Sequence, residues 1–195
     1  MNKIIVALLA GVCFAQPALA QDAPATSNAR DGARIEVRGI WETPTVSSVV
    51  EDDDVYKLGS ALAVGGEVGF DVAVGSNLVV GPYATYELSS VENCDGTDCV
   101  SAKDNIAAGL HLGYAVGASG QVYGKLGYDS MTLEASVTGA NVQESGEGVA
   151  FAVGYEHGFG PNLYGRIEFG YADNGQIFGI NFQRRHAGVA LGARF

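Results

Sequence analysis

The chain has 195 residues and a formal net charge of −11, with 11 lysine and arginine residues against 22 aspartate and glutamate residues. This balance disfavours nucleic-acid binding, which needs a positive surface. The 28 glycines lie among β-branched and aromatic residues, a composition that excludes a disordered chain and suits one folded domain.

The beginning of the chain has the features of a secretion signal. A short positive start precedes an apolar run at residues 4–14, and a small-x-small cleavage motif ends at Ala20. The apolar run is too short to span a bilayer, which takes about 20 apolar residues. We therefore expect a cleaved signal peptide at residues 1–20, a flexible polar linker at 21–32 and one domain over 33–195.

The first predicted strand covers residues 33–42, where apolar and charged residues alternate up to Trp41. An aromatic residue at a strand's end is typical of a membrane barrel at the lipid–water interface. The polar loop that follows contains an acidic run at residues 51–54. This run lacks the alternating ligands and central glycine of a calcium-binding hand, so we interpret it as a solvated loop.

Seven further segments show the same period of two, which indicates strands. Their connections alternate between long and short, as in outer-membrane barrels with short periplasmic turns and long outer loops. Because proline cannot donate to a ladder, we expect a local bulge at Pro82. The further segments are 58–74, 78–88, 104–116, 121–133, 149–156, 163–171 and a last one from Asn181 or Phe182 to Phe195.

The cysteines of the loop at residues 89–103 are Cys94 and Cys99. In the oxidising compartment that a secretion signal implies, a disulfide that closes a small exposed loop is favoured. A two-cysteine metal site is the weaker alternative, because no histidine lies nearby in the sequence.

The hairpin over residues 149–171 shows the two strand faces most clearly. Ile167 and Phe169 fall on one face of its second arm, and Arg166 and Glu168 fall on the other. A soluble sheet would bury the apolar face, whereas a closed membrane barrel turns it toward lipid and keeps the charged face inside.

Two features carry a family resemblance: the hairpin sequence GYEHGFGPNLYGRIEFGY, and a last amphipathic strand that ends on Phe195. The chain resembles the small outer-membrane β-barrels of Gram-negative bacteria, the opacity-like and outer-membrane-protein-A-like group of porin-family proteins. The resemblance implies an all-β fold, an eight-stranded antiparallel up-and-down transmembrane β-barrel, with outer-membrane lipid around it. It also implies that the barrel assembly machinery reads Phe195 as an assembly signal.

With the polar strand faces turned inward, charged residues of both signs meet in the lumen. An eight-stranded barrel is only wide enough for its own side chains, and a buried charge needs a partner. We therefore expect an ion-paired plug, with a gated ion path as the alternative. The predicted network comprises Arg34, Glu36, Arg38, Glu67, Glu87, Lys125, Glu156, Arg166, Glu168 and Arg194.

The sequence thus predicts an outer-membrane protein with a structural or cell-surface role, a largely plugged lumen, no cofactor and no metal. A small cation-selective channel, favoured by the acidic loops, and an adhesin that binds host or matrix surfaces through its loops remain alternatives.

Two other classes are disfavoured. A soluble lipocalin-like carrier would need an apolar lumen and a polar exterior, the reverse of this pattern. An enzyme is not predicted, because a hydrolase would need a nucleophile beside a histidine at the outer rim. Of His111, His157 and His186, only His186 is expected near that rim, and no serine is paired with it in the sequence.

Overall fold

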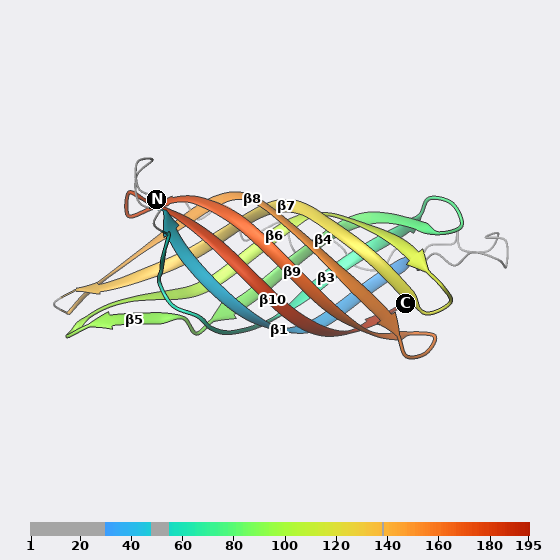
Figure 1. Cartoon of the computed structure of the whole chain (residues 1–195), viewed down its shortest axis with the longest axis horizontal. Coiled ribbons are helices and arrows are strands. Elements are labelled where there is room, and N and C mark those ends of the chain that lie inside the picture. Colours follow the sequence, from blue (N-terminus) through green and yellow to red (C-terminus); the bar gives the residue numbers. More distant parts are fainter. Residues whose placement is uncertain (1–29, 48–54, 138) are drawn as a thin grey trace.

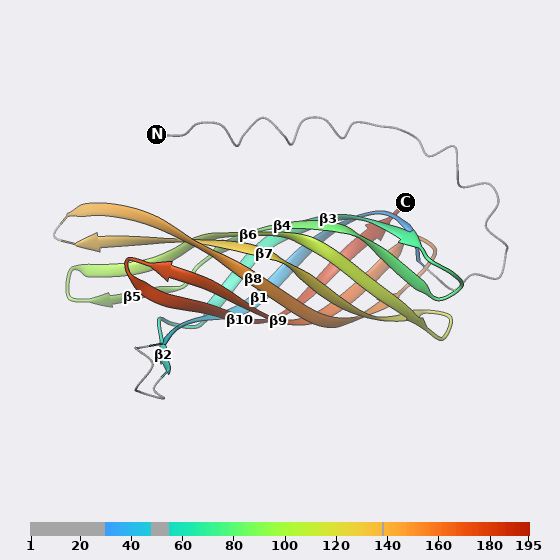
Figure 2. The same cartoon turned by 90° about the horizontal axis from the view of Figure 1, so that it is seen from above.

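The computed structural model describes residues 30–47, 55–137 and 139–195. The predicted signal peptide, most of the predicted linker and the acidic run at 51–54 lie outside the described residues. Figures 1 and 2 show a long, closed β-barrel whose strands cross its axis obliquely. Across the described ranges, no helix is long and apolar enough to cross a bilayer.

Eight long antiparallel strands form the ring, and two short strands lie on its loops. The ring closes where β1 pairs with β10, from Arg34 opposite Arg194 to Ser47 opposite Asn181. The expected eight-stranded up-and-down barrel is therefore confirmed. The ring strands are β1 (Gly32–Ser47), β3 (Ala61–Ala73), β4 (Leu78–Ser89), β6 (Asp98–Val116), β7 (Gly120–Val137), β8 (Ala140–Gly158), β9 (Leu163–Ile177) and β10 (Ile180–Arg194), and the short ones are β2 (Val55–Lys57) and β5 (Glu92–Asp95).

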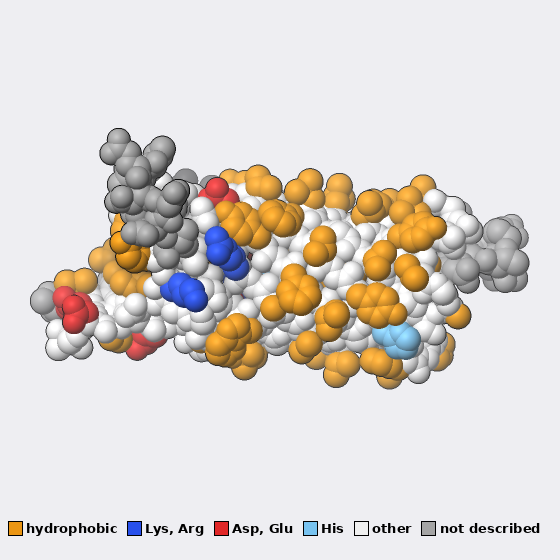
Figure 3. Space-filling model, in the orientation of Figure 1, with side chains coloured by type: hydrophobic (Ala, Val, Ile, Leu, Met, Phe, Trp, Pro, Cys, Tyr) orange, Lys and Arg blue, Asp and Glu red, His pale blue; other side chains and the backbone are white. Residues whose placement is uncertain are grey.

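The apolar face of the ring strands points outward. On β4, for example, Tyr83 and Glu87 are buried, whereas Tyr86 and Leu88 are 48% and 51% exposed. Figure 3 shows the same distribution, with apolar side chains spread over the barrel wall. An apolar outer wall around a polar interior is the arrangement of a membrane barrel.

The short turns and Phe195 lie at one end of the barrel, on the right in Figure 1, and the longer hairpins lie at the other. Because the short turns of outer-membrane barrels face the periplasm, the longer hairpins point outward from the cell. We call this second end the outer end.

The strands extend further at the outer end than the alternation predicted. β6 begins at Asp98 rather than at residue 104, β7 ends at Val137 rather than at residue 133, and β8 begins at Ala140 rather than at residue 149. Most of the two expected loops, at 89–103 and 134–148, therefore forms hairpins. The alternation of apolar and polar residues did not reveal these extensions, because a sheet surrounded by water need not carry a strictly apolar face.

The bulge expected at Pro82 is wrong. The register of β3 on β4 is unchanged from Gly69 opposite Tyr83 to Val72 opposite Val80. Two neighbouring pairs are missing from the ladder, Phe70 opposite Pro82 and Asp71 opposite Gly81. The backbones are close there, because a Cβ on Gly81 would lie 1.7 Å from the Phe70 carbonyl oxygen. The barrel accommodates the missing N–H by a local gap in the ladder, without inserting a residue.

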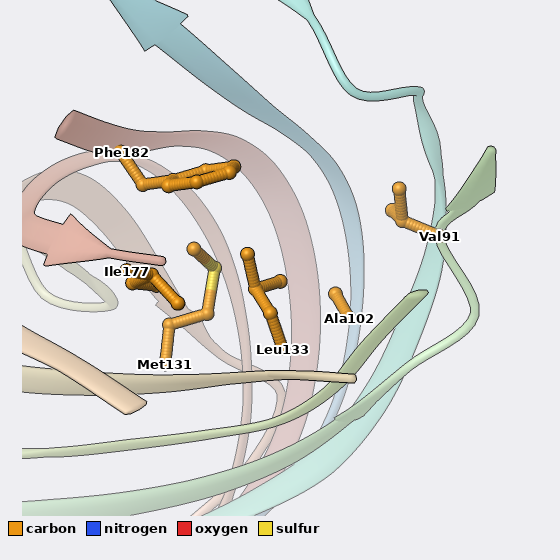
Figure 4. Packing of buried hydrophobic residues seen from close by; sticks show 6 residues of the cluster. All are labelled: Val91, Ala102, Met131, Leu133, Ile177 and Phe182. Carbon is orange, nitrogen blue, oxygen red and sulfur yellow. The ribbon is translucent and has the colours of Figure 1, made fainter. Parts of the chain in front are cut away.

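The interior changes character along the barrel. The membrane part is filled by charged and polar side chains, whereas the outer end holds a packed apolar group. Figure 4 shows these side chains converging from several strands. We call this group the outer apolar cluster, and it consists of Val91, Ala102, Met131, Leu133, Ile177 and Phe182.

Candidate functional site in the barrel lumen

The structure turns all ten charged residues of the predicted network into the lumen, where none is more than 8% exposed. Five further acidic, basic or histidine residues that sequence reasoning left out of the network are also buried there. The period of two could have found most of them, because residues four positions apart on a strand share a face. Asp71 lies four residues after Glu67, and Asp129 lies four residues after Lys125. The five are Glu42, Asp71, His111, Asp129 and Arg184.

Glu67 is the centre of the network. Its carboxylate lies 2.5 Å from Nη1 of Arg38 and 2.5 Å from Nζ of Lys125. It also pairs with Arg34, and Nη1 of Arg166 lies 3.5 Å away. Four cations from β1, β7 and β9 thus converge on one carboxylate of β3, which ties distant parts of the ring together.

Glu168 on β9 forms a second node beside Glu67. Lys125 Nζ lies 2.5 Å from its carboxylate, the Tyr123 hydroxyl donates to it at 3.0 Å, and Arg38 also pairs with it. Lys125 and Arg38 each bridge Glu67 and Glu168. Shared partners of this kind satisfy buried charges whose desolvation would otherwise be costly.

The periplasmic part of the network is organised by Glu156. Arg166 donates to one oxygen of this carboxylate from Nη2 at 2.7 Å and from Nε at 2.9 Å. Arg194 and Arg30 approach it at 3.0 and 3.1 Å. Arg30 precedes β1, so this contact brings the start of the described chain across the periplasmic mouth of the lumen.

A histidine–carboxylate pair lies next to this level. Nδ1 of His111 is 2.9 Å from Oδ1 of Asp71, and the other carboxylate oxygen is 3.1 Å from Nε of Arg34. Nη1 of Arg194 lies 3.3 Å from the same carboxylate. His111 is therefore a member of the paired interior.

The network toward the outer end is centred on Arg184. Its guanidinium lies 2.5 Å from Glu42 and 2.5 Å from Glu87. Nearby, Asp129 accepts a hydrogen bond of 2.8 Å from Asn105 and another from Asn174. The outer apolar cluster lies beyond this level, so the lumen is filled first by ion pairs and then by hydrocarbon.

Aromatic rings fill the space between the charges. The guanidinium carbon of Arg166 lies 4.6 Å from the centroid of the Tyr123 ring, and Nζ of Lys125 lies 5.1 Å from that of Tyr83. Two cavities among the lumen side chains measure about 30 and 10 Å³. Such volumes hold one or two water molecules, which is far less than a hydrated ion requires.

The remaining histidines do not form a surface site with the residues described. His186, which was expected near the outer rim, points into the lumen, where its Nε2 lies 3.5 Å from Glu168 and its side chain is 11% exposed. His157 lies at the periplasmic end, where the Tyr155 hydroxyl is 3.3 Å from its Nδ1. The rim position predicted for His186 is thus wrong, because this residue lies within the closed ring, opposite Glu42 on β1 and Gly170 on β9, on the inward face of β10.

Cys94 and Cys99 form the predicted disulfide and lie opposite each other on the β5–β6 hairpin. Their sulfur atoms are committed to this bond, so the structure does not support the alternative of a two-cysteine metal site. Phe195 is 77% exposed, and its backbone N–H donates to the Ala33 carbonyl at 2.9 Å. Its recognition by the assembly machinery stays a prediction.

Comparison with known proteins gives one family and several similar folds. Residues 5–195 match the family described as outer membrane protein beta-barrel domain. Neisserial surface protein A has a TM-score of 0.60 at 12% identity, over 84% of this chain and 97% of that one. The attachment invasion locus protein of Yersinia pestis, solved in complex with a heparin analogue, has a TM-score of 0.57 at 12% identity, over 84% and 99%. No curated protein matches the sequence significantly.

Proposed function

Because the chain belongs to the family of outer-membrane-protein β-barrel domains, we propose that it is a structural protein of the bacterial surface whose lumen is closed to ions. Its location is the outer membrane. The observation that carries the proposal is the convergence of Arg34, Arg38, Lys125 and Arg166 on Glu67. An ion crossing the barrel would have to break several of these buried pairs at once.

Energetic reasoning supports a closed resting state. Breaking a buried ion pair by removing one partner typically costs about 3–5 kcal/mol, because it leaves an uncompensated charge in a poorly solvated site. Spontaneous opening of several such pairs is therefore rare. The outer apolar cluster adds a second barrier, since an ion would lose its hydration on entering a hydrocarbon-lined constriction.

Planar-bilayer recording of the purified barrel tests this function. We expect no single-channel steps from the wild type, and steps from a variant that combines Arg166→Ala with Leu133→Ser, which weakens both barriers. Arg185→Ala is the matched control, because Arg185 is an exposed arginine next to the lumen residue Arg184. Stable steps from the wild type would refute the closed lumen, and cation selectivity of those steps would favour a small cation channel.

Adhesion is a second candidate, favoured by the hairpins that project at the outer end (Figure 2). The similar Yersinia pestis protein was solved with a polyanion. The outer hairpins of this chain carry many carboxylates, among them Glu92, Asp95, Asp98 and Glu134, and these would repel such a ligand. Binding of the purified barrel to host cells or matrix, with and without added heparin, would test adhesion; competition by heparin would contradict this reasoning.

A further inference from the structure

Part of the outer end is an open sheet. β8 pairs with β9 only from Ala150 onward, whereas its pairing with β7 continues to Ala140. β5 and the outer parts of β6 and β7 complete a four-stranded sheet that projects past the β9–β10 turn (Figures 1 and 2). We call this part the outer sheet, and it consists of β5 with residues 98–102, 132–137 and 140–145.

One face of the outer sheet is polar and internally bonded. Lys103 Nζ lies 2.8 Å from Glu134, and Gln143 donates to the same carboxylate at 2.6 Å. The hydrogen bond from Lys103 and that from Gln143 hold the pKa of Glu134 below its usual range. The hydroxyls of Thr132 and Ser145 lie 2.9 Å apart on the same face. This face is suited to water.

The opposite face is apolar and continues the inner face of the barrel. Ala135 and Val137 follow Leu133 at a period of two, and Val100 and Val142 both lie opposite Ala135 on the neighbouring strands. Leu133 is fully buried in the outer apolar cluster, but Val137 and Val142 are 49% and 57% exposed. Among the described residues, about half of each of these two valine side chains therefore stays accessible.

A sheet with one polar and one apolar face is normally covered on the apolar side. The charge at its margin indicates what covers it here. Asp95 and Asp98 lie opposite each other on the same side as Val100. Glu144, whose carboxylate accepts a hydrogen bond of 2.9 Å from the Phe178 backbone N–H, lies on the same side as Val142. A basic partner would complement these carboxylates, whereas a second copy of this acidic chain would bring the same charges against them.

The edge of β8 provides a backbone for such a partner. Over residues 140–145 this strand has a ladder partner on one side only among the described residues. An exposed edge can pair with an added strand, whose alternate side chains then cover the sheet face. We propose that the apolar face of the outer sheet binds an extended segment of another protein. Every second residue of that segment faces the sheet, and these facing residues include both apolar side chains and lysine or arginine.

This inference rests on the placement of the outer sheet outside the membrane, and it does not depend on whether the lumen conducts. The test uses the full barrel in detergent micelles and a fluorescein-labelled ten-residue peptide of sequence VTKTVTKTVT. In an extended strand its valines and lysines share one face and its threonines occupy the other. A matched peptide carries glutamate in place of lysine. Fluorescence anisotropy measures both. We expect saturable binding of the basic peptide, no binding of the acidic one, and weaker binding at higher salt because charge pairs are screened.

Two variants separate the proposed face from the rest of the surface. Val137→Ser with Val142→Ser is expected to raise the Kd of the basic peptide at least tenfold. Asn141→Ser, beside Val142 but on the polar face, is expected to leave it unchanged. Heat-modifiable gel mobility checks that each barrel is folded, and because both valines are exposed we expect no change in it.

Four outcomes would overturn the proposal. The first is equal binding of the acidic and basic peptides, and the second is unchanged binding of the basic peptide by the double valine variant. The third is a concentration-dependent dimer of the barrel that the double valine variant abolishes. The fourth is binding of the basic peptide only after deletion of residues 48–54. The third would assign the face to a second copy of the chain, and the fourth to that loop.

Discussion

At the scale of single residues, the lumen is held together by carboxylates that serve several cations at once. Glu67 pairs with cations from three strands, because β1, β7 and β9 each carry at least one arginine or lysine that contacts its carboxylate. Neutralising it would leave these cations together in a confined space with less compensation. The consequence for stability is therefore larger than the loss of one exposed ion pair.

Replacing Glu67 by Gln tests this role without changing the size of the side chain. We expect the free energy of unfolding to fall by about 3–5 kcal/mol, because buried cations lose their shared partner. Urea unfolding followed by heat-modifiable gel mobility measures it. Glu134→Gln, at the partly exposed pair with Lys103, is the control and should change the free energy of unfolding far less than Glu67→Gln. Equal effects of the two variants would contradict a central role for Glu67.

Phe195 is the residue whose predicted role concerns assembly. It is 77% exposed at the periplasmic end, so changing it to Asp removes few internal contacts. We expect Phe195→Asp to reduce insertion in cells while spontaneous folding into detergent stays near the wild-type yield. Comparing folded fractions in the two settings measures this. Equal losses in both would indicate simple destabilisation and argue against recognition by the assembly machinery.

At the scale of elements, the hairpins at the outer end are continuations of the ring strands rather than loops. The disulfide joins directly opposed residues of β5 and β6. β6 is held on its other side by β7, with pairing that extends out to Cys99 opposite Ser136. The bond therefore fastens β5 to the edge of a sheet that already has its own ladder.

Changing Cys94 and Cys99 together to Ser should leave the barrel folded. A cross-link over so short a loop stabilises by about 2 kcal/mol at most, and this stabilisation is local to the hairpin. We expect unchanged heat-modifiable mobility, but faster proteolysis within residues 89–98. A barrel that no longer folds would show that the hairpin takes part in closing the ring.

At the scale of the whole molecule, the two ends of the barrel differ in kind. The periplasmic end has short turns and a polar recess of about 380 Å³ lined in part by Arg30, Glu156 and Arg194. The outer end has long hairpins, the outer apolar cluster and the open outer sheet. Under the proposed function such a barrel is closed in its middle, and the binding surface that we propose lies at the outer end only.

This orientation can be tested by epitope insertion on intact cells. A peptide tag placed after Gly139, at the tip of β7 and β8, should bind antibody without lysis, because that tip points outward. A tag after Gly117, in the short turn between β6 and β7, should bind only after the outer membrane is permeabilised. The reverse pattern of labelling would invert the orientation assigned to the barrel.

The strand count and the facing of the side chains could be predicted from the sequence, because both depend on local alternation. A period of two separates Arg166 and Glu168 from Ile167 and Phe169 regardless of what lies across the barrel. The disulfide followed in the same way from two nearby cysteines and a secretion signal. Alternation failed where both faces were partly polar, which is why β6, β7 and β8 were predicted too short.

Only the tertiary structure decided which charges meet. Glu67 and Arg166 are 99 positions apart, and their proximity depends on ring closure and on the stagger of every intervening strand pair. The same closure brought Ile177 and Phe182 over Leu133 to form the outer apolar cluster, and the end of pairing at Ala150 left the outer sheet open. Local sequence specifies the face on which a side chain stands, but the summed register around the barrel determines its partner across the lumen.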